Sequence, residues 1–95
     1  MPPLGDDQLH AALVALPGWG VVEGMLVKAF TFEEGFIRGI RFVDAVAEAA
    51  EAADHHPDID IRWTTVTIRL VTHSEGGITE LDLTLAGVCD GLAAG

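Results

Sequence analysis

The alternation of apolar and polar residues divides the chain into helical and extended segments. Residues 6–16 carry leucines at helical spacing, and Pro17-Gly18 ends that predicted helix. Residues 19–30 place β-branched and aromatic side chains on both sides of Glu23-Gly24. That pattern predicts two strands joined by a tight turn. The chain is therefore expected to begin with a short helix followed by a hairpin.

The longest helical pattern covers residues 32–53. Apolar residues three and four positions apart predict its buried stripe: Phe36, Ile40, Val43, Ala47 and Ala50. Pro57 disfavours helical geometry at His56, so this helix is expected to stop near Asp54.

A second hairpin and a last helix follow. Residues 59–63 and 66–70 alternate apolar and polar positions, which predicts two half-buried strands with a turn at Thr64-Thr65. After Gly76-Gly77, the segment 79–82 has the form of a helix start. The stripe predicted for this helix is Leu81, Leu85, Val88 and Leu92. The order α-β-β-α-β-β-α predicts an α+β fold, in which three helices pack on one face of a four-stranded antiparallel sheet and leave the other face partly open.

Length and charge narrow the possible functions. With 95 residues, the chain is expected to form one domain over residues 1–95, a size at which self-association would add stability. Fifteen acidic against five basic side chains give a net charge of -10, which disfavours direct binding to nucleic acid. Cys89 is the single cysteine, so no intramolecular disulfide is expected. Without a long apolar run or a leader-like start, the sequence predicts a soluble cytoplasmic protein with no membrane association.

Three of the four histidines lie beside the second predicted hairpin. His55 and His56 precede its first strand, and His73 follows its last strand. Antiparallel pairing brings these ends together, so the three imidazoles are expected at one end of the sheet. Imidazoles suit proton transfer near neutral pH. Carboxylates that could orient the rings or raise their basicity are Glu51, Asp54, Asp58 and Asp82.

Spacing alone leaves other interpretations open. The histidines could be solvated loop residues, and Asp82 could simply complete a capping box with Thr79. Histidines beside acids could also bind zinc or iron. A metal site has the weaker support, because the adjacent His55 and His56 are expected to point in different directions.

Two motifs together resemble the pterin-4a-carbinolamine dehydratase family. They are E-A-A-D-H-H-P from Glu51, and T-H-S-E-G-G-I-T-E-L-D from Thr72 to Asp82. The family pattern places an acidic residue before His-His-Pro, then a Thr-His that ends a strand, then an aspartate nine residues after that histidine. The chain departs from the pattern at Ala52, where lysine is common, and at Thr64-Thr65, where asparagine is common.

The resemblance implies an activity. Family enzymes remove water from 4a-hydroxytetrahydropterin to give quinonoid dihydropterin, without a metal or redox cofactor, in the recycling of the pterin used by aromatic amino acid hydroxylases. By this analogy His56 and His73 are expected to be the acid/base pair, with His55 in support. The residues expected to bind or orient the substrate are Glu51, Asp54, Pro57, Thr72 and Asp82.

The resemblance also implies a homodimer or homotetramer. It admits a non-catalytic alternative, because some relatives act as a dimerisation cofactor or an assembly factor. Such relatives tend to lose part of the histidine set, and this chain keeps His55, His56 and His73.

Overall fold

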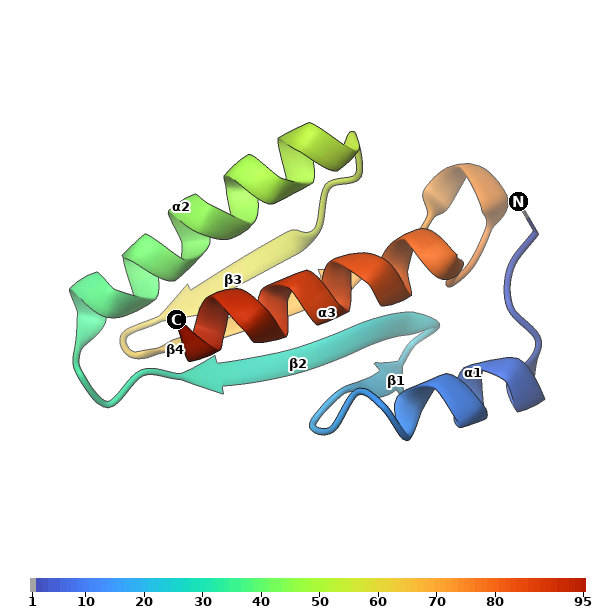
Figure 1. Ribbon diagram of the computed structural model, residues 1–95, viewed down its shortest axis with the longest axis horizontal. Helices are drawn as coiled ribbons and strands as arrows, with labels where there is room; N and C mark the ends of the chain where they lie inside the picture. The colour runs from blue at the N-terminus through green and yellow to red at the C-terminus, as the bar shows by residue number, and fades with distance from the viewer. Residues whose placement is uncertain (1) are drawn as a thin grey trace.

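The computed structural model describes residues 2–95 as an α+β fold (Figure 1). Its α-helices are α1 (Asp6–Leu13), α2 (Phe36–Ala53) and α3 (Glu80–Ala94). Its strands are β1 (Gly20–Val22), β2 (Met25–Thr31), β3 (Asp58–Arg62) and β4 (Thr65–Leu70), and the short 3-10 helix η1 (His73–Glu75) follows β4. The predicted order of helices and hairpins is confirmed.

The four strands form one antiparallel sheet in the order β1-β2-β4-β3. Helices α2 and α3 lie across one face of this sheet, and α1 lies beside β1 at its margin (Figure 1). The core fills the space between the sheet and the helices. Val66, Ile68 and Leu70 of the central strand β4 are completely buried there, because every second residue of the strand faces α2 and α3.

The buried stripe of α2 shares Ala50 with the predicted one and otherwise differs from it. Its buried residues are Gly39, Phe42, Val46 and Ala50, whereas Phe36 is 46% exposed. The Phe42 ring packs between Phe30 and Phe32, with centroid distances of 4.9 and 5.0 Å. These aromatic contacts determine which face of α2 is buried against the sheet. They cannot be inferred from the sequence of the helix alone.

Helices α1 and α3 also depart from the predictions. Helix α1 ends at Leu13 rather than Leu16, and the next residues form tighter three-residue turns such as Leu16 N–H to Leu13 C=O, because the chain must turn before Pro17. In α3, Leu85 is buried as predicted, but Leu81 and Val88 are about two-fifths exposed. The other buried residues of α3 are Asp82, Ala86 and Cys89.

The turn of the second hairpin lies one residue earlier than predicted. Arg62 pairs with Thr65, so Trp63 and Thr64 form the turn and Thr65 belongs to β4. This register pairs Ile61, which is 41% exposed on the edge strand β3, with the buried Val66. It also leaves Trp63 79% exposed with a left-handed φ of 51°, rather than within a strand.

Within residues 2–95, no helix combines the length and the apolar character needed to cross a membrane.

Candidate functional site

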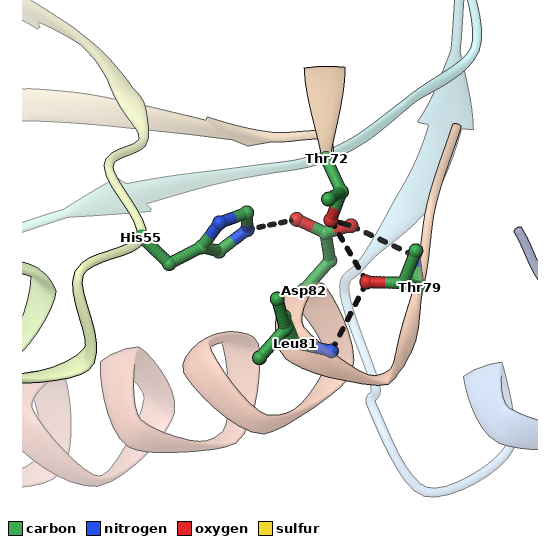
Figure 2. Close-up of polar contacts among 5 residues, drawn as sticks. All are labelled: His55, Thr72, Thr79, Leu81 and Asp82. Atoms are coloured by element: carbon green, nitrogen blue, oxygen red, sulfur yellow. Dashed lines mark hydrogen bonds and ion pairs between the residues drawn. The ribbon is translucent and has the colours of Figure 1, made fainter. Parts of the chain in front are cut away.

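A buried carboxylate connects the two histidine-containing motifs. Asp82, in the first turn of α3, is completely buried. Figure 2 shows this carboxylate between His55 on one side and Thr72 and Thr79 on the other. One oxygen, Oδ1, lies 2.5 Å from Nε2 of His55. The segment that follows α2 and the segment that follows β4 therefore meet at the start of α3.

The second oxygen of Asp82 accepts two hydrogen bonds. The Thr72 hydroxyl and the Thr79 backbone N–H each donate to Oδ2 at 2.8 Å. The bond from Thr79 belongs to the capping box that Thr79 forms with Asp82, and the Thr79 hydroxyl also accepts from Leu81 N–H at 3.2 Å. Asp82 thus caps its helix and holds a histidine. The two roles that the sequence left as alternatives are combined in one side chain.

The position of His55 is fixed by how α2 ends. Asp54 adopts a left-handed φ of 50°, and the next residue, His55, donates its backbone N–H to the Ala50 carbonyl at 3.0 Å. This is the six-to-one bond of a Schellman cap. It turns the chain sharply, and the His55 side chain reaches Asp82 as a result.

The hydrogen bonds of Asp82 determine which nitrogen of His55 carries a proton. An ionised carboxylate only accepts, so Nε2 of His55 must be the donor, and the lone pair of the neutral ring is on Nδ1. Within residues 2–95 every buried side-chain nitrogen or oxygen has a hydrogen-bond partner. No hydrogen-bond partner contacts Nδ1 there, so this nitrogen is not among the fully buried atoms, although His55 as a whole is only 9% exposed.

The neighbouring His56 is exposed and has its own carboxylate. Its Nε2 lies 2.5 Å from Oε1 of Glu51, one turn from the end of α2. Glu51 accepts from Nε2 for the same reason as Asp82, so His56 also presents Nδ1. The side chains of this pair are 55% and 78% exposed. The adjacent histidines therefore separate as the sequence suggested, one buried and the other at the surface.

His73 is the first residue of η1 and is exposed. The preceding Thr72 is fixed by a two-way backbone bridge with Gly77. Thr72 and His55 both bind the Asp82 carboxylate, and His73 and His56 are the residues that directly follow them. The structure thus joins the Thr-His and His-His-Pro motifs through one buried group.

The remaining predicted residues lie outside this network. The Asp54 side chain is exposed, and its backbone forms the cap of α2. Pro57 is half-buried between His56 and the start of β3. Sequence reasoning did not assign the Thr79 hydroxyl to the site. The spacing from Thr79 to Asp82 is the available signal, and by itself it predicts only a helix start.

A groove between α2 and α3 lies next to His55. It has a volume of about 230 Å³, and His55 forms part of its wall. The other lining residues are mainly apolar: Ala49, Ala53, Glu80, Leu81, Thr84, Leu85 and Val88. In the part of the chain that the structure describes, no three His, Cys, Asp or Glu side chains are grouped so as to hold a metal ion.

Comparisons with known proteins agree on one family. The profile of the family described as pterin 4 alpha carbinolamine dehydratase matches residues 2–92. A protein of Mycobacteroides abscessus with a provisional name as a pterin-4-alpha-carbinolamine dehydratase is 57% identical over 90 residues, which cover 95% of each chain. A Mycobacterium sp. (strain JLS) protein with the same provisional name is 58% identical over 90 residues, again covering 95% of each chain.

Solved structures show the same fold. The crystal structure of a transcriptional coactivator/pterin dehydratase from Brucella melitensis superposes with a TM-score of 0.91 at 34% identity, covering 96% of this chain and 98% of that one. A pterin dehydratase-like protein, identified as a RuBisCO assembly factor in the alpha-carboxysome, superposes with a TM-score of 0.64 at 30% identity. The match covers 79% of this chain and 86% of that one. The chain therefore belongs to the pterin 4 alpha carbinolamine dehydratase family.

Proposed function

We propose that this protein catalyses the dehydration of a 4a-hydroxytetrahydropterin to the quinonoid dihydropterin and water. Membership of the family supports the substrate class. The observation that carries the proposal is the bond between buried Asp82 and Nε2 of His55, which leaves Nδ1 of that imidazole without a partner in the protein. A histidine oriented from behind by a buried carboxylate is a common arrangement in acid/base catalysis.

The reaction needs one group that removes a proton and one that supplies a proton. A base takes the proton from a ring nitrogen, the C–O bond at carbon 4a breaks, and a C=N bond forms. An acid protonates the departing hydroxide, which leaves as water. His56 and His73 are exposed and can meet a substrate, so we assign them as the acid/base pair. The pterin is the substrate, and no cofactor is required.

The other site residues act on these imidazoles. Glu51 holds the ring of His56 at 2.5 Å and selects its Nε2–H tautomer. Asp82 does the same for His55, whose proposed role is to position the substrate from the buried side of the site. Thr72 holds the Asp82 carboxylate in place. The groove between α2 and α3 has His55 in its wall, so a flat heterocycle bound at its mouth would lie beside this imidazole.

Alanine substitutions at His56 and His73 test the assignment. Each single variant, and the double variant, should dehydrate a chemically generated 4a-hydroxytetrahydropterin at least about 10²-fold more slowly in stopped-flow measurements. His10→Ala is the matched control, because His10 is exposed on α1 and takes no part in the hydrogen bonds that join the two motifs. Turnover of the double variant near that of the control would exclude acid/base catalysis by this pair.

A second candidate function is protein binding without catalysis. It is supported by the named role of the similar assembly factor and by exposed apolar side chains at the start of α2, Phe36 and Ile37. Wild-type protein that gives no acceleration over the uncatalysed loss of water would favour this function over the enzyme.

The proposal also covers the oligomeric state, the cellular compartment and the source of the substrate. We propose that the chain forms a homodimer or homotetramer, acts in the cytoplasm and is coupled to an aromatic amino acid hydroxylase that supplies the hydroxylated pterin. Light scattering after gel filtration would give the oligomeric state. A mass equal to one chain at micromolar concentration would contradict the oligomer.

A further inference from the structure

The hydrogen bonds behind Asp82 form a chain with a fixed direction. Thr72 donates its single hydroxyl proton to Asp82, so the 2.8 Å bond between the Thr72 and Thr79 hydroxyls must be donated by Thr79. Thr79 in turn accepts from the backbone N–H of Leu81. The protons therefore point in one direction, from the first turn of α3 through two hydroxyls to the carboxylate (Figure 2).

This chain cannot reverse while α3 is folded. Its first member is a backbone N–H, which only donates, and Thr79 is completely buried, so water does not replace it. With its oxygen occupied by Leu81, the Thr79 hydroxyl directs its proton to Thr72. The Thr72 proton is then directed to Oδ2 of Asp82, which fixes the carboxylate with its other oxygen, Oδ1, facing His55.

We propose that Thr79 is a positioning residue for the dehydration: its hydroxyl, oriented by α3, holds the Thr72 hydroxyl and through it the Asp82 carboxylate, which keeps Oδ1 within hydrogen-bond distance of Nε2 of His55 and so maintains the Nε2–H tautomer. This inference rests on the proposed function for its catalytic consequence. Its structural consequence, the tautomer of His55, can be measured without any substrate.

Three substitutions separate the hydroxyl from the helix cap. Thr79→Ser keeps both the hydroxyl and the cap. Thr79→Val removes the hydroxyl and keeps the side-chain shape. Thr79→Gly also removes the hydroxyl, but glycine is a residue that still caps helices well. Asp90→Asn is the matched control for weakened packing of α3, because Asp90 binds Trp19 and Lys28 toward the other end of that helix.

The readouts are the imidazole nitrogen chemical shifts of His55 by NMR and the pH profile of dehydration. Wild type, Thr79→Ser and Asp90→Asn should show the Nε2–H tautomer. Thr79→Val and Thr79→Gly remove the donor that holds Thr72, so the Asp82 carboxylate is held less firmly against His55 and the ring should show a mixture of tautomers and an altered pH profile. Their kcat should fall about 10-fold or more with little change in KM, which is the scale for losing a partner behind a functional histidine.

Folded Thr79→Val and Thr79→Gly proteins with the wild-type tautomer and pH profile would overturn the inference. If Thr79→Val does not fold, the Thr79→Gly result decides. A mixed tautomer in Thr79→Gly together with an inactive wild-type protein would refute the proposed dehydration but support the positioning role of the hydroxyl.

Discussion

Asp82→Asn tests whether one buried carboxylate serves both folding and catalysis. Asp82 accepts from Thr72, Thr79 and His55 at 2.8, 2.8 and 2.5 Å. Hydrogen bonds to a charged group contribute about 1.5–3 kcal/mol each, so Asp82→Ala would cost on the order of 5 kcal/mol. The free energy of unfolding of a small domain is about 5–15 kcal/mol in total, so the alanine variant is expected to be largely unfolded. The asparagine variant is therefore the informative one.

Asparagine keeps the shape of Asp82 and changes its hydrogen-bonding capacity. Its carbonyl can still accept from Thr72 and Thr79, but these neutral bonds are about half as strong, and its NH₂ group must face His55. His55 then has to accept at Nε2 and carry its proton on Nδ1. The free energy of unfolding should fall by about 2–3 kcal/mol, which corresponds to a melting temperature lower by roughly 10–20 °C for a domain of this size.

The catalytic loss should exceed what destabilisation explains. Because Asp82→Asn places His55 in the wrong tautomer, the dehydration rate of the folded variant should fall about 10²-fold or more. Stopped-flow rates and urea denaturation would be measured on the same preparations, with Asp90→Asn as the control that loses stability alone. A folded Asp82→Asn protein with the rate of Asp90→Asn would refute the assignment of Asp82 to His55.

Three further predictions concern the fold. Asp54→Gly should raise the free energy of unfolding by up to about 1 kcal/mol, because glycine adopts the left-handed cap of α2 without strain; lower stability in urea would contradict this role of Asp54. Trp63→Gly should be neutral or stabilising by a similar amount, given its φ of 51° and its 79% exposure. A loss above about 1 kcal/mol would show that Trp63 is covered in solution, for example by a second copy. Burial, reinforced by Asp90, raises the pKa of the Cys89 thiol from 9.0 to about 11. The unfolded chain therefore loses this proton first, and stability should fall between about pH 9 and 11 by on the order of 2 kcal/mol. Urea titrations of Cys89→Ala should lack this slope, and an unchanged slope would refute the contribution.

The order of elements could be predicted because local signals were strong along the whole chain. Glu23-Gly24 forms the first hairpin turn as expected, and α2 ends at the residue before Asp54 as the proline at 57 required. The errors concern how elements meet. Phe42 faces the core because Phe30 and Phe32 of another segment are there to receive it. Helical spacing cannot reveal that choice when apolar residues cover a wide arc.

The candidate site was predictable in its histidines and in Asp82, whereas Thr72 was expected only through the family resemblance and the Thr79 hydroxyl was not expected. His55, His56 and Asp82 stand out because such residues are seldom placed in or near a core without a partner. Threonine is common in strands and at helix starts, so Thr72 and Thr79 carry no comparable signal. Their role follows from three-dimensional proximity: a hydroxyl at the end of β4 meets one at the start of α3.

The use of Asp82 for two purposes explains why catalysis and folding should be coupled in this chain. Oδ2 of Asp82 stabilises the start of α3 by accepting from Thr79 N–H, and the same oxygen accepts the proton of Thr72. The other oxygen is then left for His55 alone. A change that frays the first turn of α3 therefore releases the imidazole as well. Conversely, a ligand that holds His55 in place should stabilise α3, since binding to the folded state alone raises the free energy of unfolding.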